Sequence, residues 1–276
     1  MAISHRSTGG ARSPLVDERP PTALEFALGH YRGPFIVLLI LLPLACWAWV
    51  VALARDMYGP MTGASAWMMT LQWDVRHALL LWLMWAVMMA GMMLPSATPM
   101  LVMFGLAARR RASGAAASRE IYALAAGYLA VWALFSVVAT AAQYFLSMRL
   151  AISPMMTLTS PRAGAALLVV AGIYQITPLK HTCLQRCQSP FGFLMHHWRA
   201  GTGGAVRMGF EHGVYCVGCC WALMLLLFVG GVMNLAVIAG LTAFVAFEKL
   251  SPFGAQTARV SGVLLVGLGG WMLTSL

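Results

Sequence analysis

Long apolar runs separated by short polar stretches dominate the sequence from Phe35 to Leu276. A helix needs about 20 largely apolar residues to cross the hydrocarbon core of a bilayer, and windows of that kind recur throughout this part of the chain. We expect seven helices, near residues 35–54, 77–106, 120–146, 163–178, 208–229, 232–248 and 259–275. The pattern therefore predicts an all-α protein, a polytopic transmembrane helical bundle of about seven spans.

The sixth of these segments is the shortest, and only Gly230 and Gly231 separate it from the fifth. Glycine pairs are typical of tight turns. The fifth and sixth segments could therefore form a re-entrant hairpin, with fewer complete crossings.

The first 34 residues differ from the rest, because they are polar and are interrupted by Pro14, Pro20, Pro21 and Gly33. No short apolar stretch with a small-residue cleavage site follows the basic start, so we expect no cleaved signal peptide. The sequence predicts a disordered cytoplasmic tail over residues 1–34 and a transmembrane helical domain over residues 35–276.

Composition supports a membrane environment, since 61% of the 276 residues are hydrophobic and only 9% are charged. Soluble domains contain about 25% charged residues. No segment is polar enough to form a separate soluble domain with its own core.

Basic residues alternate between the two predicted sides of the bundle. Loops on the cytoplasmic side of a membrane retain Lys and Arg. If the N-terminus is inside, all but four of the 18 basic residues fall on the cytoplasmic side, the exceptions being Arg55, Arg76, Arg149 and Arg162. We expect a multi-pass protein of the cytoplasmic (inner) membrane, with its N-terminus inside and its C-terminus outside. The net charge of +10 is then a topology signal, and no nucleic-acid partner is predicted.

Cysteine and histidine residues gather around the start of the fifth segment. Five of the six cysteines lie within 38 residues, in "PLKHTCLQRCQSP" and "HGVYCVGCC". Thiols stay reduced in the cytoplasm, so structural disulfides are not expected there. Residues three or four apart share a helix face, which lets two side chains reach one ion. The candidate metal ligands are His181, Cys183, Cys187, His212, Cys216, Cys219 and Cys220.

The same cysteines have a simpler explanation, because cysteine also packs as a small apolar residue. The pattern leaves open whether the two groups form one site or two. Glu211 could orient His212, or it could pair with Arg207 one turn earlier.

Methionines form a stripe in the second segment, where Met84, Met88 and Met92 repeat every four residues. Thioethers are soft ligands that suit Cu(I), so these residues, with Met208, are weaker candidate ligands. Methionine also fills apolar cores, and packing explains the stripe equally well. Pro95 removes a helix hydrogen bond to Gly91, and a carbonyl freed in this way can help to build an ion site.

Two polar positions near the sixth segment receive structural explanations. Asn234 is expected to cap the helix. Glu248 and Lys249 are expected to form a pair at the membrane interface.

Several ordered motifs resemble one known family. They are "MWAVMMAGMMLPSATPM", "YQITPLKHTCLQRCQSP", "GAVRMGFEHGVYCVGCCWALMLLLFVGGVMNL" and "FEKL". Together they are similar to a prokaryotic family of predicted metal-binding integral membrane proteins of unknown function, over about residues 76–250. The resemblance implies a polytopic membrane protein whose cysteines and histidines bind metal, and it brings no transport or catalytic activity.

Three functions remain after this reading. The first is binding of a soft transition metal ion, copper as Cu(I) before zinc as Zn(II), in metal transport or delivery. Its expected partners are the lipid bilayer, the metal ion and a metal-donor or metal-acceptor protein. The second is a membrane thiol oxidoreductase that uses Cys216 and Cys219. The third is a non-catalytic membrane subunit or assembly factor. No hydrolase or ATP-binding motif is present, so no enzyme class is predicted.

Overall fold

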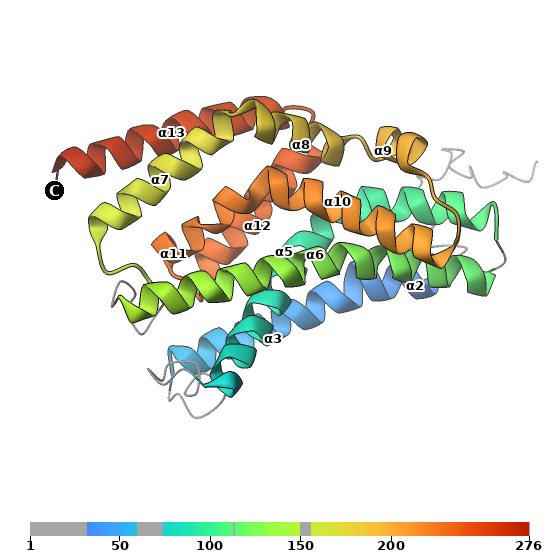
Figure 1. Ribbon diagram of the computed structural model, residues 1–276, viewed down its shortest axis with the longest axis horizontal. Helices are drawn as coiled ribbons and strands as arrows, with labels where there is room; N and C mark the ends of the chain where they lie inside the picture. The colour runs from blue at the N-terminus through green and yellow to red at the C-terminus, as the bar shows by residue number, and fades with distance from the viewer. Residues whose placement is uncertain (1–31, 60–73, 113, 150–155, 276) are drawn as a thin grey trace, which may run out of the picture.

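The computed structural model describes residues 32–59, 74–112, 114–149 and 156–275, and these residues are almost entirely helical (Figure 1). The all-α prediction is therefore confirmed. Residues 1–31 of the expected disordered tail lie outside the described residues, whereas Arg32 already belongs to the first helix.

A helix lies at each of the seven expected segments. The elements are α2 (Arg32–Ile36), the π-helical turn η1 (Val37–Leu41), α3 (Leu42–Met57), α5 (Val75–Arg109), α6 (Gly114–Met148), α7 (Pro161–Ile176), α8 (Pro178–Gln188), α9 (Pro190–His197), α10 (Gly201–Met224), α11 (Leu226–Gly230), α12 (Leu235–Leu250) and α13 (Gly254–Ser275). Helices α6, α10 and α13 begin several residues before the apolar segments that predicted them, because their first turns are polar or glycine-rich.

The stretch expected to be a loop, from residue 179 to 207, instead contains α8, α9 and the start of α10. Local capping explains the first of these helices. Pro178 occupies the first turn of α8, and the Thr177 side chain accepts a hydrogen bond from the backbone N–H of Lys180. Proline suits a first turn because its missing N–H has no partner there in any helix. A second proline, Pro190, begins α9 in the same way.

Five helical stretches are long and apolar enough to cross a bilayer: Gly33–Met57, Val75–Arg109, Gly114–Met148, Gly201–Gly230 and Gly254–Ser275. Helices α7 and α8 meet this standard together, although a bend of 64° separates them. Helix α12 has 16 residues and is shorter than a usual span. The number of crossings and the orientation therefore stay predictions.

Glycines hold two helix pairs in close contact (Figure 1). A side chain at Gly209 of α10 would collide with the backbone carbonyl of Leu124 in α6, and one at Gly127 would collide with that of Val206. Helices α7 and α13 lie side by side in the same manner, at Gly172 and Gly262. Small residues at such contacts let backbones approach closely, as in membrane helix pairs.

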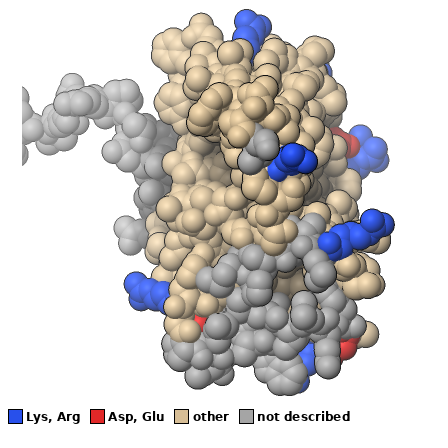
Figure 2. All heavy atoms as spheres, turned by 90° about the vertical axis from the view of Figure 1, so that its left-hand side faces the viewer, with Lys and Arg blue, Asp and Glu red and all other residues tan. Residues whose placement is uncertain are grey.

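The described surface at one end of the molecule carries few charges (Figure 2). Isolated basic and acidic side chains stand among broad uncharged areas. Along the helices, large apolar side chains are exposed, among them Leu44, Val138, Leu264 and Trp271. Exposed apolar area of this extent fits a lipid-facing surface.

Helix α5 continues through Pro95 and Pro99. The carbonyl of Gly91, which Pro95 frees, accepts a hydrogen bond of 3.2 Å from Trp47 Nε1 in α3. A neighbouring helix therefore satisfies this carbonyl. The Gly91 carbonyl was expected to help build an ion site, but in the structure it bonds to Trp47.

A buried ion pair fastens α8 to α12. Lys180 Nζ lies 2.7 Å from Glu248 Oε2, and both side chains are almost inaccessible. Gln175 joins the pair, since its amide donates to Glu248 Oε1 and to Ser261 Oγ of α13, each at 2.9 Å. Glu248 is thus paired with Lys180, and the expected interfacial pair of Glu248 with Lys249 is wrong. Buried charges need such partners, because an unpaired one is costly away from water.

Candidate metal centre

The cysteines lie where α8 packs against α10. Cys183 and Cys187 are one turn apart on α8, and the sequence between Pro178 and Gln188 is helical, so the expected spacing is real. A side chain at Gly218 of α10 would lie only 2.8 Å from Cys183 Sγ. Glycine at this position therefore allows the two cysteine-bearing helices to touch.

Thiols of two different helices come close together. Cys219 Sγ of α10 lies 4.0 Å from Cys187 Sγ of α8. Cys216, Cys219 and Cys220 are each 1% exposed, and Cys187 is half-buried. The two cysteine groups, 32 residues apart at this contact, therefore meet, and we call Cys183, Cys187, Cys216, Cys219 and Cys220 together the thiol cluster.

Within α10 the thiols turn toward different partners. Cys219 Sγ and Cys220 Sγ lie 3.1 Å and 3.0 Å from the carbonyl oxygen of Cys216. Cys216 Sγ instead faces α6 and α12, at 3.0 Å from Tyr128 Oη and 2.9 Å from Lys249 Nζ. The contact of Cys187 with Cys219 joins two helices, so the geometry favours coordination across helices.

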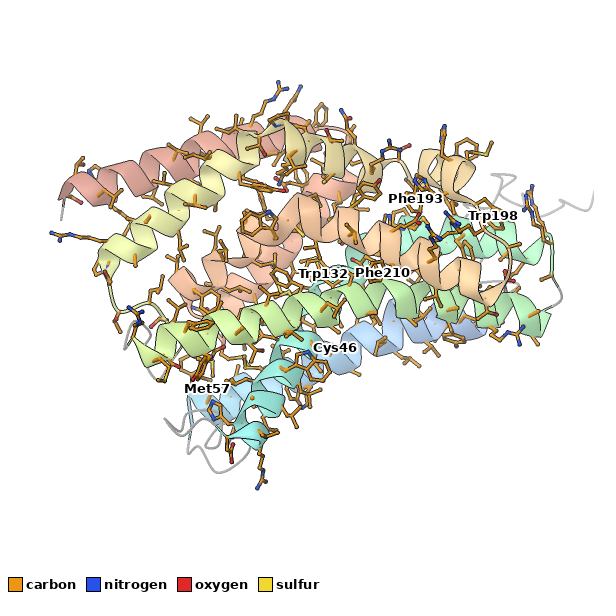
Figure 3. All side chains as sticks on the ribbon, viewed as in Figure 1. Cys46, Met57, Trp132, Phe193, Trp198 and Phe210 are labelled. Carbon is orange, nitrogen blue, oxygen red and sulfur yellow. The ribbon has the colours of Figure 1, made fainter. Side chains whose placement is uncertain are left out.

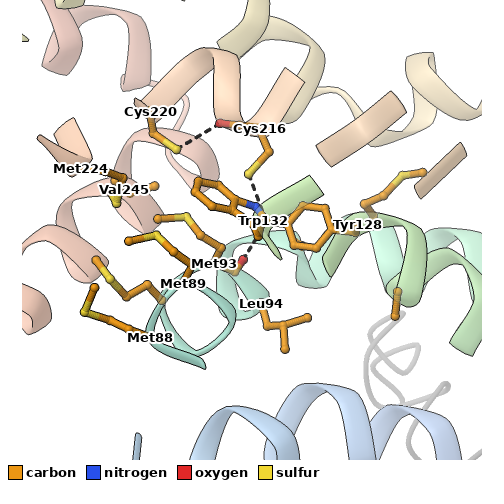
Figure 4. Close-up of a cluster of buried hydrophobic side chains, with 14 of the residues drawn as sticks. Met88, Met89, Met93, Leu94, Tyr128, Trp132, Cys216, Cys220, Met224 and Val245 are labelled. Carbon is orange, nitrogen blue, oxygen red and sulfur yellow. Dashed lines mark hydrogen bonds between the residues drawn. The ribbon is translucent and has the colours of Figure 1, made fainter. Parts of the chain in front are cut away.

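Methionines extend the cluster along α5. Met88, Met89 and Met93 belong to the same buried core as Cys216 and Cys220, and Figure 4 shows their thioethers beside Trp132. Met93 shares a partner with a thiol, because its Sδ lies 3.9 Å from the Lys249 ammonium that contacts Cys216. The Tyr128 hydroxyl also donates to the Met93 carbonyl, at 3.1 Å.

The stripe that periodicity selected is buried as well. Met84, Met88 and Met92 are each at most 1% exposed, but so are Met89 and Met93. Buried methionines therefore lie on more than one face of α5, and a period of four does not identify which face meets the thiols.

His212 lies on α10 one turn before Cys216, between aromatic rings. Its ring centroid is 5.9 Å from that of Tyr128 and 5.4 Å from that of Phe193. The side chain is 5% exposed, and its Nδ1 has no hydrogen-bond partner. Buried polar atoms nearly always have a hydrogen-bond partner. Because this nitrogen has none, it is free to bind a metal ion beside the thiol cluster.

Two other candidate metal ligands, His181 and Met208, contact nitrogen atoms outside the thiol cluster. His181 Nε2 lies 3.5 Å from Arg259 Nε of α13. Met208 is fully buried, and its Sδ lies 3.2 Å from the backbone nitrogen of Arg199. These contacts are not with thiols, so the structure gives neither residue a place in the thiol cluster.

Of the two roles that the sequence left open for Glu211, the structure shows the pairing with Arg207. Its Oε1 lies 3.0 Å from Arg207 Nε, one turn earlier, and 3.9 Å from Arg199 Nη2. The carboxylate is thus a partner of arginines, and His212 keeps its free nitrogen.

Sequence reasoning missed Lys249, Tyr128 and Met93. Lys249 carried a usable signal, since an ionisable residue within an apolar helix is a functional candidate by default. Tyr128 and Met93 carried none, because only the packing of α5, α6 and α10 brings them to Cys216.

Among the described residues, no three His, Cys, Asp or Glu side chains are grouped so as to hold one ion. A tetrahedral zinc site needs four such ligands. Two sulfurs 4.0 Å apart can still contact one ion, because a metal–thiolate bond is about 2.3 Å long and twice that length exceeds their separation. The arrangement therefore fits an ion that is held by as few as two ligands.

Comparison with known proteins gives one match. No curated protein and no solved structure matches the chain. A family model described as "PpoB2: Copper chaperone" matches residues 82–272, which include α8, α10, α12 and most of α5. The match supports the copper part of the expected metal binding. The chain belongs to the PpoB2 copper chaperone family.

Proposed function

We propose that this protein is a multi-pass protein of the cytoplasmic membrane that binds Cu(I) in the thiol cluster and hands it to or from a partner protein. The observation that carries the proposal is the 4.0 Å approach of Cys187 and Cys219 across α8 and α10. Membership of a copper chaperone family supports the choice of metal.

Copper is favoured over zinc by the chemistry of the donors. Thiolates and thioethers are soft ligands that suit Cu(I). In the described residues the sulfurs of Met93 and Cys216 contact the same ammonium, that of Lys249, and no three His, Cys, Asp or Glu side chains are grouped. Zinc would lack the four ligands that its structural sites require.

The membrane part of the proposal is supported by the helices themselves. Five stretches are long and apolar enough to span a bilayer, and α7 with α8 forms a bent sixth. In the predicted topology the ends that carry α8 and α9 face the cytoplasm. The thiol cluster would then lie within reach of a cytoplasmic metal donor or acceptor.

A cavity near the same end of the bundle supplies a surface beside α9. It has a volume of about 570 Å³ and is lined by Met103, Leu106, Ala107, Arg110, Arg111, Phe191, Leu194, Met195 and Trp198. Figure 3 shows Phe193 and Trp198 in this region, and Arg111 stacks over the Trp198 ring at 4.5 Å. This mixed basic and apolar wall is accessible to a partner.

The test is the metal content of the full chain, purified in detergent under reducing conditions and loaded with Cu(I). The parent is compared with a variant that carries Cys216→Ser, Cys219→Ser and Cys220→Ser. Cys46→Ser is the matched control, because Cys46 is also buried but lies on α3 against Gly91, away from α8 (Figure 3).

We expect near-stoichiometric copper in the parent and in Cys46→Ser, and its loss in the triple variant. Equal copper in all three would place the metal elsewhere. No copper in any of them would reject the proposal and leave the cysteines to dithiol chemistry or to packing.

A further inference from the structure

Lys249 is a buried cation at the edge of the thiol cluster. It is 5% exposed, near the end of α12. Its ammonium contacts Cys216 Sγ at 2.9 Å, Ser96 Oγ at 3.2 Å and Met93 Sδ at 3.9 Å. Two of these three contacts are to sulfur.

No carboxylate neutralises this cation within the described part of the chain. Glu248, its neighbour in sequence, is bound to Lys180 on the other side of α12. Glu211 is held by Arg199 and Arg207. The structure therefore places a positive charge inside the protein, in contact with two sulfurs and a hydroxyl.

The charge of a bound ion then decides whether the buried site is neutral. Cu(I) held by two thiolates, with the other thiols protonated, gives a complex of charge −1, and Lys249 brings the total to zero. Zn(II) held by two thiolates is neutral, and Lys249 brings that total to +1. A net charge enclosed in a low-dielectric interior is strongly unfavourable.

A third thiolate would restore neutrality with Zn(II), but the described residues do not group three such ligands. The same three-thiolate arrangement would leave Cu(I) with a net charge of −1. Coordination by two thiolates and the positive charge of Lys249 therefore both favour Cu(I).

From this juxtaposition of an unpaired buried ammonium and a cysteine sulfur, we infer that Lys249 is a specificity-determining residue that selects a monovalent metal ion over a divalent one. The inference rests on the proposed function, since it concerns the same thiols. Lys249 acts through charge and through Cys216, so it is a positioning residue and not a ligand.

The test compares binding of Cu(I) and of Zn(II) to the purified full chain, each in competition with a chelator of known affinity. Lys249→Leu removes the charge and adds no sulfur that could bind copper, whereas Lys249→Arg keeps the charge. Ser96→Ala is the matched control, because it removes a neutral neighbour of the same ammonium.

We expect Lys249→Leu to lower the ratio of Cu(I) to Zn(II) association constants by at least about tenfold, because removing the cation penalises only the anionic Cu(I) complex. Lys249→Arg and Ser96→Ala should keep the ratio within about threefold of the parent. A merely structural role for Lys249 would weaken both metals together and leave the ratio unchanged.

Failure of this inference and failure of the proposed function give different experimental results. An unchanged ratio in Lys249→Leu, in a chain that loses copper on Cys219→Ser, overturns this inference and leaves the proposed function in place. Copper binding that survives Cys219→Ser and the triple serine variant overturns the proposed function itself. If Lys249→Leu binds neither metal, the ratio in Lys249→Arg against a Lys249→Gln variant decides, and equal ratios there overturn the inference.

Discussion

At the scale of residues, the candidate site depends on a few polar groups inside an apolar bundle. Cys216 is the clearest case, because its sulfur contacts a hydroxyl of α6 and an ammonium of α12 while its carbonyl contacts two further thiols. An apolar core alone would need none of these contacts. The chemistry of the site is therefore set by side chains from at least three helices.

Replacing His212 should have opposite effects on the stability of the metal-free protein and on its affinity for Cu(I). In the metal-free chain its unpartnered Nδ1 should cost about 1–3 kcal/mol, because a buried nitrogen without a hydrogen bond loses its hydration. His212→Phe fits the aromatic surroundings of Tyr128 and Phe193, so it should raise the melting temperature of the metal-free protein.

The same change should lower Cu(I) affinity by about tenfold if the free nitrogen joins the copper, since about 1.4 kcal/mol corresponds to that factor. Melting curves and chelator competition measure the two effects. A lower melting temperature with unchanged affinity would show that the ring only packs.

The sequence predicted the cysteines but not their neighbours. The i, i+4 spacing of Cys183 and Cys187 and the shared face of α10 were visible as patterns. Lys249 was misread because Glu248 beside it offered a local partner, and only the tertiary structure shows that Glu248 binds Lys180. Contacts between distant segments are decided by packing, which local spacing does not encode.

At the scale of elements, close helix contacts position the thiols. Helix α10 carries three cysteines and meets α6 through Gly209 and Gly213, where any side chain would strike Leu124 or Val131. Helix α8 meets α10 at Gly218. These glycines set how far α10 can approach its two neighbours.

Gly209→Ala should therefore destabilise the protein by about 1–3 kcal/mol, because an added methyl group has no space beside the Leu124 carbonyl. Gly203→Ala, on the same helix with no atom within 4 Å of the new methyl group, is the control and should be neutral or slightly stabilising. Thermal unfolding in detergent measures both. Equal melting temperatures for the two variants would contradict the close contact.

Apolar periodicity predicted every long helix but missed α8 and α9. These two helices are short and mixed in character, and they begin with Thr177–Pro178 and Ser189–Pro190, signals of capping and not of hydrophobicity. Helix ends were displaced for the same reason, as at Gly201 and Gly254. Polar first turns belong to a helix without contributing to its apolar pattern.

At the scale of the whole molecule, the alternation of basic residues predicts a single orientation in the membrane. Arg110, at the end of α5, should lie inside, and Arg162, at the start of α7, should lie outside. Both side chains are exposed, so either position accepts a reactive probe.

Arg110→Cys and Arg162→Cys should differ in labelling of intact cells by a maleimide that does not cross membranes. We expect Arg162→Cys to react in intact cells and Arg110→Cys to react only after permeabilisation, with the unmodified chain as the background. Reaction of both positions from the same side would reject the predicted topology.

The whole account depends on copper being held between α8 and α10. The most direct measurement is copper X-ray absorption fine structure of the Cu(I)-loaded full chain, compared with Cys187→Ser and Cys46→Ser. We expect mainly sulfur neighbours in the parent and in Cys46→Ser, and fewer of them in Cys187→Ser, since Cys187 is the α8 thiol that lies 4.0 Å from Cys219. A copper shell of nitrogen and oxygen alone, or one that Cys187→Ser leaves unchanged, would contradict the account.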